Sequence, residues 1–392
     1  MANEQVKLAV IGVGAMGRLH AKDILKLPNT ELAAVCDINP ERAETNAKAC
    51  GCKMFTDYRK MLDQVELDGV IIATPHNGHP PISIDCLQHG LHVLTEKPIA
   101  TNLADAQKMV SDYHAARKEH PALQFAIMFQ MRTYGHWRKV KELIDNGDLG
   151  RLVRTTWIIT DWFRTQSYYD NGEWRATWGG EGGGVLLNQS PHNLDLFQWF
   201  VGMPQGVIAT AALGKYHDIE VEDEVTACLE YQNGMVAHFI TSTAESPGTN
   251  RLEIVGEGGK LVVEDGRLTF WRNRNSMLEQ IRTSPDPFEP VETWKIDVPF
   301  KHHGRWGHDL MIENFANAIL HGEPLIAPAV EGINQLHLSN AMMLSSFTSA
   351  PVDLPIDAQQ FATELASRIK NSRFQKTVRL QEWQDVSNSF GT

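Results

Sequence analysis

The sequence lacks the features that mark membrane-spanning, secreted and nucleic-acid-binding proteins. No apolar run approaches the roughly 18–20 residues that span a bilayer, and the opening segment of residues 1–5 is polar, so we expect no signal peptide. Acidic residues outnumber basic ones, 48 to 36, and the formal net charge is −12 at pH 7. Nucleic acids and anionic membranes are bound by clustered Lys and Arg. We therefore expect neither as a partner.

Cysteine is also scarce. The chain has five cysteines, and the closest pair, Cys50 and Cys52, lacks the two-residue spacer of redox and zinc motifs. We therefore expect free thiols and a cytoplasmic protein. The closest histidine pairs, at positions 76/79 and 302/303, match no helical zinc pair. The sequence predicts no bound metal.

Hydrophobic patterning divides the 392 residues near position 130. The first part alternates short apolar runs with amphipathic stretches, which is typical of βα units around a parallel sheet. Strands are expected at 7–11, 32–36, 69–73, 92–95 and 124–129, and helices at 18–27, 40–49, 58–64, 81–89 and 103–119. The pattern therefore predicts an α/β domain.

The later part of the chain changes character. After a helix at 136–145, closely spaced alternating segments predict an antiparallel or mixed sheet, with a long irregular loop over 272–306. Strands are expected at 152–160, 207–213, 225–231, 235–243, 251–255 and 260–263, and further helices at 308–320, 332–346 and 357–370. This order of elements predicts an α+β domain.

The clearest motif follows the first expected strand. The segment Gly12-Val13-Gly14-Ala15-Met16-Gly17 ends that strand and opens a helix, the context of a dinucleotide fingerprint. Gly12 permits a tight turn, Gly14 lets the backbone approach a pyrophosphate, and Gly17 allows close helix–sheet packing. Asp37, 20 residues after Gly17, stands where a carboxylate binds ribose hydroxyls and repels a 2′-phosphate. The motif predicts NAD rather than NADP; a glycine turn without a ligand is the alternative.

Polar residues follow other strands of the same expected sheet. Ligands of open α/β sheets bind outside the carboxyl ends of the strands, so Lys97, in Thr-Glu-Lys-Pro at 95–98, is expected to face the cofactor. Judged alone, it would be a solvated surface lysine. The residues expected to contact the cofactor are Gly12, Gly14, Ala15, Met16, Gly17, Asp37, Thr74, Pro75, His76, Asn77, His79, Glu96, Lys97 and Gln130.

A third motif lies in a glycine-rich segment of the second part. Residues 182–195 read Gly-Gly-Gly-Val-Leu-Leu-Asn-Gln-Ser-Pro-His-Asn-Leu-Asp. If 188–195 are helical, Asn188 and His192 fall on one face at i and i+4. An amide beside an imidazole suits a site that handles an alcohol proton. A histidine packed inside a helix is the alternative.

Together, the glycine fingerprint, the strand-end Glu-Lys-Pro and the Gly-Gly-Gly…His-x-x-Asp segment resemble the glucose–fructose oxidoreductase/inositol dehydrogenase (Gfo/Idh/MocA) family over most of the chain. The resemblance implies a Rossmann domain and a second domain built on an open sheet that is often the oligomer surface. It also implies that Lys97 and His192 serve the substrate carbinol. Many members carry Asp at the position of Asn188, so the proton acceptor stays open between Lys97 and His192.

Aromatic and arginine residues crowd into one segment before the glycines. Four of the ten tryptophans fall within residues 157–178. Aromatic faces stack on sugar rings, and Arg and Tyr bind hydroxyl or carboxylate groups; a lid or interface cluster is the alternative. The segment resembles the pyranose and glycoside dehydrogenases of the levoglucosan type. The residues expected to contact the substrate are Lys97, Arg164, Tyr168, Trp174, Arg175, Trp178, Asn188, His192 and His302.

These observations predict an α/β Rossmann domain with a parallel sheet over residues 1–130, which binds NAD. A second α+β domain over 131–392, with a large open, mainly antiparallel sheet, is expected to bind substrate and to form a homo-oligomer, a dimer or tetramer. The expected catalytic residues are Lys97, His192 and Asn188.

The expected reaction is hydride transfer between NAD and a secondary alcohol of a sugar, anhydrosugar or glycoside, with C3 of a pyranose as one candidate position. Two alternatives remain. One is an NAD-dependent glycosidase that uses transient oxidation and elimination. The other is a non-catalytic protein that senses NAD or sugar.

Overall fold

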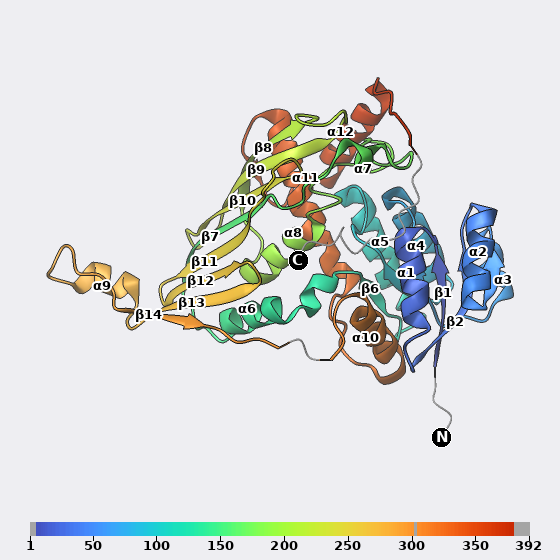
Figure 1. The fold of residues 1–392 in the computed structure, drawn as a ribbon, viewed down its shortest axis with the longest axis horizontal. Helices are drawn as coiled ribbons and strands as arrows, with labels where there is room; N and C mark the ends of the chain where they lie inside the picture. The colour runs from blue at the N-terminus through green and yellow to red at the C-terminus, as the bar shows by residue number, and fades with distance from the viewer. Residues whose placement is uncertain (1–4, 302–303, 380–392) are drawn as a thin grey trace.

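The computed structural model describes residues 5–301 and 304–379, which form two sheets with helices packed against them (Figure 1). The first sheet has six parallel strands in the order β3-β2-β1-β4-β5-β6. Its strands are β1 (Val6–Ile11), β2 (Thr30–Cys36), β3 (Lys53–Phe55), β4 (Gly69–Ile72), β5 (His92–Thr95) and β6 (Phe125–Ile127). The prediction of a parallel α/β sheet is confirmed.

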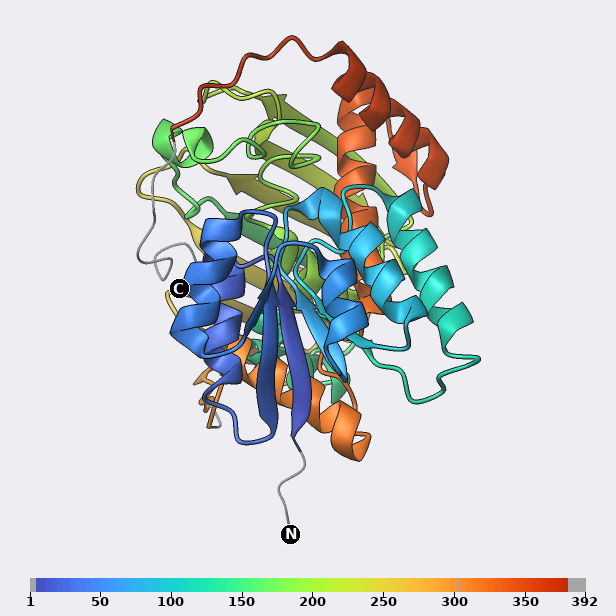
Figure 2. The same cartoon turned by 90° about the vertical axis from the view of Figure 1, so that its right-hand side faces the viewer.

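Helices flank the first sheet (Figure 2). They are α1 (Ala15–Ile24), α2 (Pro40–Cys50), α3 (Tyr58–Gln64), α4 (His79–Gln88) and α5 (Leu103–Ala116), with short 3₁₀ turns η1 (His76–Gly78) and η2 (Gln130–Thr133). Three begin at side-chain caps: Asn39, Asp57 and Asn102 each accept a hydrogen bond from a backbone N–H of the first turn. These local signals explain why the sequence pattern located the helices within a few residues.

The second sheet has nine strands in the order β14-β13-β12-β11-β7-β10-β9-β8-β15. Its strands are β7 (Leu152–Ile159), β8 (Gly206–Leu213), β9 (Glu222–Glu230), β10 (Val236–Ser242), β11 (Asn250–Gly256), β12 (Gly259–Glu264), β13 (Arg267–Asn273), β14 (Thr293–Asp297) and β15 (Val352–Asp353). All neighbours are antiparallel except β7 and β10. The prediction of a large, mainly antiparallel sheet is confirmed.

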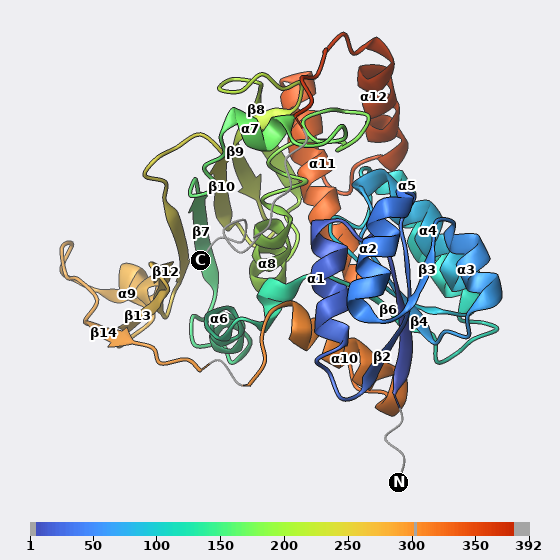
Figure 3. The ribbon, with the colours of Figure 1, turned by 45° about the vertical axis from the view of Figure 1, so that its right-hand side comes forward.

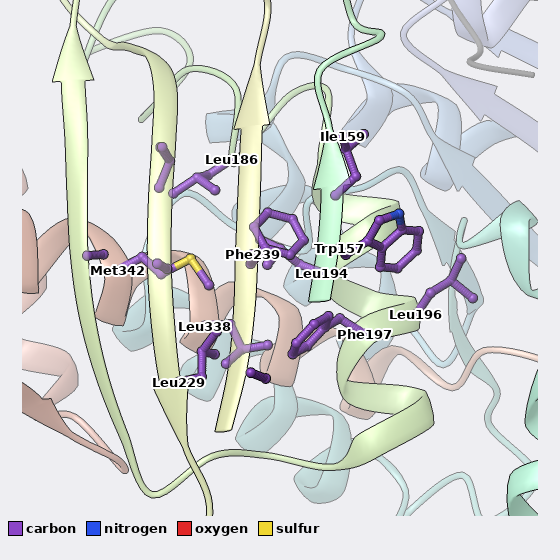
Figure 4. Close-up of a cluster of buried hydrophobic side chains, with 14 of the residues drawn as sticks. Trp157, Ile159, Leu186, Leu194, Leu196, Phe197, Leu229, Phe239, Leu338 and Met342 are labelled. Carbon is purple, nitrogen blue, oxygen red and sulfur yellow. The ribbon is translucent and has the colours of Figure 1, made fainter. Parts of the chain in front are cut away.

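One face of the second sheet carries the larger hydrophobic core (Figure 4). The helices of this part of the chain are α6 (Gly135–Asp145), α7 (Gln166–Asp170), α8 (Pro191–Val201), α9 (Met277–Thr283), α10 (His308–His321), α11 (Gly332–Thr348) and α12 (Ala358–Asn371), with the 3₁₀ turn η3 (Ala329–Glu331). Trp157 of β7 and Phe239 of β10 pack in one cluster with Phe197 of α8 and Met342 of α11. The helices α8 and α11 therefore lie between the two sheets.

The chain returns to the first sheet after the second is complete. Helix α10 packs beside α1 (Figure 3), and its Met311, Ile312 and Phe315 join the hydrophobic cluster of the first sheet. A backbone bridge also joins Ala126 to Pro328. The predicted boundary near residue 130 falls in η2, but the core of the first sheet also uses side chains from this later part of the chain.

Two local predictions are wrong. Residues 272–306 contain α9 and β14 rather than one irregular loop. Every residue of β14 is exposed and α9 buries none, so neither shows the alternating burial that the sequence pattern detects. The helix expected over 188–195 begins only at Pro191, a residue that favours the first helical turn because it lacks an N–H.

Within residues 5–301 and 304–379, no helix combines the length and apolar character needed to cross a membrane.

Candidate active site

The glycine turn after β1 has the shape that a dinucleotide requires. Gly12 has φ +86°, and a Cβ there would lie 2.7 Å from the carbonyl oxygen of Ala73; one on Gly17 would lie 1.8 Å from that of Gly12. A Cβ on Gly14, by contrast, would meet nothing within 4 Å. Gly14 is the N-cap of α1, and no side chain caps this end of the helix. The turn fits a pyrophosphate at a helix N-terminus.

Asp37 joins this turn to the end of β2. Its buried carboxylate accepts hydrogen bonds from the backbone N–H groups of Val13 (3.0 Å) and Asn39 (2.9 Å). The guanidinium of Arg42 lies 3.3 Å from both carboxylate oxygens. A carboxylate offers about four lone-pair sites; two are taken by the backbone N–H groups, and the other two share one long contact with Arg42, which a ribose hydroxyl can replace. The residues present fit the adenosine half of NAD.

Lys97 follows β5, at the carboxyl end of the first sheet. Its Nζ donates a hydrogen bond to the backbone oxygen of Asn188, at 2.7 Å. Burial lowers the pKa of Lys97 to about 8, against the opposing effect of Glu96. Glu96 itself binds His20 through one oxygen (2.7 Å) and the backbone N–H of Lys97 through the other (3.1 Å). Lys97 is therefore held at its backbone by Glu96 and at its ammonium by Asn188, and its pKa is lowered towards neutral pH.

His192 lies in the first turn of α8, close to Lys97. Gln130 Nε2 donates to His192 Nε2 at 3.2 Å, which leaves the ring proton on Nδ1. Burial, and then the charge of Lys97, hold the pKa of His192 well below its ordinary value. Arg132, two residues after Gln130, forms a two-pronged ion pair with Asp195 of α8, at 2.8 and 2.6 Å. This pair fixes α8 against η2 and sets the contact between Gln130 and the neutral imidazole.

Asn188 reaches the site through its backbone. Its side chain faces away from His192: Tyr168 Oη donates to its Oδ1 at 3.3 Å, and its Nδ2 donates to a carboxylate oxygen of Glu181. Because α8 begins at Pro191, the two residues do not share a helix face, and that expectation is wrong. Asn188 does lie near Lys97, as the sequence predicted, but it makes the contact through its backbone oxygen rather than its side chain.

Part of the aromatic segment gathers beside the first sheet. Arg175 donates to Tyr168 Oη at 2.8 Å, and its guanidinium lies over the rings of Tyr168 (4.6 Å) and Trp174 (4.4 Å). The Arg164 guanidinium lies over Tyr168 at 5.1 Å. The ring of Trp174 meets that of His76 edge-on at 5.1 Å. Tyr168, Trp174, Arg164 and Arg175 thus adjoin the strand ends that carry the cofactor residues.

Other tryptophans of this segment serve the hydrophobic core. The three that are buried are Trp157, Trp162 and Trp178. Trp178 packs against Phe347 (6.0 Å) and Arg368 (5.5 Å), so the structure assigns it to the core rather than to the substrate. Of the predicted substrate residues, His302 lies outside the described residues. The clustering of tryptophans is visible in the sequence, but the sequence does not show which of them pack in the core and which face the site.

The remaining residues that were predicted to contact the cofactor from the end of β4 are partly exposed and partly buried. Asn77 and Pro75 are exposed, and Thr74 is half-buried, at the end of β4. His79 is buried, with its ring nitrogens 2.9 Å from the Thr74 oxygen and 2.8 Å from the Pro98 oxygen. Its ring therefore ties two strand-end loops together and positions them.

Sequence reasoning missed three charged residues. Arg42 reaches Asp37 because the first turn of α2 folds it back. Glu181 is buried in a glycine-rich segment, and a lone carboxylate there was the only sequence feature that could have indicated a functional role. Lys376, far along the chain, donates to the backbone oxygen of Tyr169. In the described part of the chain, no group of three or more His, Cys, Asp or Glu residues is arranged to hold a metal.

Comparison with known proteins decides the family. Residues 6–126 match the model of the Gfo/Idh/MocA oxidoreductase family with an NAD-binding Rossmann fold, and residues 137–262 match the Gfo/Idh/MocA C-terminal domain. The chain belongs to the Gfo/Idh/MocA family. It is accordingly an oxidoreductase whose cofactor is NAD, and the predictions of family, enzyme class and cofactor are confirmed.

Relatives within the Gfo/Idh/MocA family cover most of the chain. Inositol 2-dehydrogenase of Rubrobacter xylanophilus is 28% identical over 272 residues, 67% of this chain and 72% of that one. The WlbA dehydrogenase of Bordetella pertussis, solved with NADH and UDP-GlcNAcA, is 27% identical with a TM-score of 0.76, over 90% of this chain and 100% of that one. Levoglucosan dehydrogenase, solved with NADH and levoglucosan, shares the fold at 21% identity and TM-score 0.73, with coverage of 90% and 100%.

Proposed function

We propose that this protein oxidises a secondary alcohol of a sugar, anhydrosugar or glycoside, with C3 of a pyranose as the first position to test. The observation that carries this proposal is the place of Lys97: its Nζ is held by the Asn188 oxygen, close to His192, at the carboxyl end of the NAD-binding sheet. Burial there lowers the pKa of Lys97 to about 8. Dehydrogenation of inositol by one relative and the binding of UDP-GlcNAcA and levoglucosan by others support a carbohydrate or polyol substrate.

Lys97 is proposed to exchange the hydroxyl proton. With a pKa of about 8, a useful fraction of the side chain is a neutral amine at physiological pH. The bond to the Asn188 oxygen uses one N–H and aims Nζ, while the lone pair of the amine is left for the substrate proton. Bound NAD supplies the hydride acceptor for the carbon of the same alcohol.

His192 is proposed to donate a hydrogen bond rather than to accept the proton. Gln130 holds its Nε2 as an acceptor, so Nδ1 carries the hydrogen. Within the described chain His192 Nδ1 is buried and has no partner, as expected of a group that meets a ligand. Its lowered pKa keeps the ring neutral, so it can polarise a carbinol oxygen without gaining charge.

Tyr168, Trp174 and Arg175 are proposed to hold the sugar. Their rings and guanidinium offer an apolar face and hydrogen-bond donors in one place. Such a surface suits a ring whose C–H and O–H groups point in different directions.

A panel of sugars, anhydrosugars, glycosides and polyols tests the proposal. Each is incubated with the protein and NAD, and absorbance is followed at the NADH band, with Lys97→Ala as the matched control. We expect at least one cyclic secondary alcohol to give NADH with the wild type only. Release of an aglycone without NADH would favour a glycosidase, and NAD binding with no turnover would favour a sensor.

We also propose a homo-oligomer formed through the open face of the nine-stranded sheet, and a cytoplasmic location. Apolar side chains are exposed on that sheet at Ile208 (52%), Val236 (38%) and Trp271 (39%), and burial of such side chains against a second copy favours association. All five cysteines are free thiols, which suits a reducing compartment. Light scattering of wild type and Ile208→Asp tests the assembly: a smaller particle is expected for the variant, and an unchanged one would refute this surface.

A further inference from the structure

Glu181 is a buried carboxylate at the centre of the glycine-rich loop. Its side chain is 1% exposed. One carboxylate oxygen accepts the backbone N–H of Ala176 at 2.6 Å, and the other accepts Asn188 Nδ2. Its backbone oxygen meets His76 Nδ1 at 3.0 Å. One residue thus contacts the aromatic segment, the lysine-binding segment and the end of β4.

The hydrogen bonds indicate that Glu181 is ionised. The backbone N–H of Ala176 and the amide of Asn188, which bind its two oxygens, are pure donors, and an ionised carboxylate is a pure acceptor. Burial is the largest influence and leaves the pKa of Glu181 above its ordinary value, although Arg175 and the donors from Asn188 and Ala176 lower it in part. A buried carboxylate that accepts only from donors therefore binds Asn188, the same residue whose backbone oxygen binds Lys97.

We propose that Glu181 is a positioning residue for Lys97: it fixes Asn188, whose backbone oxygen holds the ammonium, and it supplies a counter-charge for that ammonium. The chain of contacts runs from Glu181 to Asn188 Nδ2, and from the Asn188 oxygen to Lys97 Nζ. This role rests on the proposed function, in which Lys97 exchanges the substrate proton.

The surroundings of Lys97 and Glu181 show what else bears on this charge. The titratable and charged groups that face Lys97 are Glu96, His76, His79, Arg164, Arg175, Glu181, His192 and His308. Those that face Glu181 are Lys97, Tyr169, Arg175, Glu222 and Lys376. The negative charges of Glu96 and Glu181 both raise the pKa of Lys97. Glu96 binds His20 and the backbone N–H of Lys97, whereas Glu181 is linked to the Lys97 ammonium through Asn188.

The pKa of Lys97 can be measured without substrate. Competitive labelling with acetic anhydride over a pH series, read by mass spectrometry at Lys97, reports the fraction of neutral amine. We expect Glu181→Gln to lower this pKa by roughly 0.5–1 unit, below the 1–3 units typical of a charge in direct contact. Glu173→Gln removes an exposed carboxylate from the same loop and is the matched control, with no shift expected.

Kinetics provide the second readout. A lower Lys97 pKa leaves the amine neutral at lower pH, so the rising limb of kcat/KM for oxidation should move to lower pH by the same amount in Glu181→Gln. Glu181→Asp keeps the charge but shortens the side chain, so we expect a pKa near that of wild type with kcat reduced about tenfold or more by the misplaced Asn188.

Several results would overturn the role of Glu181. A folded Glu181→Gln protein with an unchanged Lys97 pKa is one. If that variant does not fold, Glu181→Asp decides: wild-type kcat and KM there would show that the link to Asn188 does not matter. If the wild type oxidises no sugar, the proposed function fails, but the labelling comparison still tests Glu181.

Discussion

Replacing Lys97 with Met should make the protein inactive and more stable at neutral pH. A shift of the Lys97 pKa from 10.5 to about 8 corresponds to about 3 kcal/mol of unfavourable free energy, at about 1.4 kcal/mol per unit. Replacement by Met removes this unfavourable free energy, but it also removes the hydrogen bond to the Asn188 oxygen, which stabilises the protein by about 1 kcal/mol. We therefore expect Lys97→Met to raise the free energy of unfolding by about 2 kcal/mol at pH 7.

The pH dependence gives this prediction its sign. The folded protein binds the Lys97 proton less tightly than the unfolded chain, so the penalty is complete below pH 8. It diminishes as the pH rises from about 8 towards 10.5 and is absent above that range. The gain from Lys97→Met should follow the same course and disappear at the alkaline end.

Urea unfolding of the two proteins at pH 7 and near pH 10.5 measures the difference. In parallel, Lys97→Ala should lower kcat by roughly 10²–10⁴-fold, the range for a positioned proton-transfer or electrostatic group. NAD affinity, measured by fluorescence, should change much less. A Met variant that is less stable at pH 7, or an Ala variant with near-normal turnover, would refute the assignment of Lys97 as a buried titrating residue.

Three further changes test the rest of the site. We expect the wild type to prefer NAD over NADP by at least about tenfold in kcat/KM, and Asp37→Ser to narrow this preference. Equal kcat/KM values for the two cofactors in the wild type would refute the assignment of Asp37 to the ribose. Trp174→Ala should raise KM for the sugar with NAD affinity unchanged, whereas Trp178→Ala should cost about 3–5 kcal/mol of stability as a buried aromatic; the reverse result would exchange their roles. Asn188→Asp should keep measurable activity and move the rising limb of kcat/KM to higher pH by less than about one unit, because the new carboxylate shares a proton with Glu181; a shift towards acid would contradict this geometry.

The sequence was most informative where local rules determine the structure. The glycine turn, the helix caps and five of the six strands of the first sheet each follow from short-range constraints, and their positions were predicted within a few residues. The short edge strand β3 buries none of its residues and was not predicted. Lys97 was found because strand ends of an open α/β sheet meet at one edge. The exposed strand β14 carries no burial pattern and was missed.

Contacts between distant segments limited the prediction of the site. The pattern could not show that Asn188 would bind Lys97 through its backbone, or that its side chain would turn to Glu181. Trp174 and Trp178 are only four residues apart, yet one meets His76 and the other the core. Such differences depend on how loops fold against other parts of the chain, and single-sequence patterns carry little information about that.

Transfer of deuterium from substrate to cofactor tests the central claim most directly. The best alcohol from the panel, labelled at the carbinol carbon, is incubated with the protein and NAD, and the label on the nicotinamide is measured by mass spectrometry. We predict that labelled NADH accumulates with the wild type and is reduced by roughly 10²–10⁴-fold in rate with Lys97→Ala. Label that never reaches the nicotinamide, although both NAD and the sugar bind, would contradict the account.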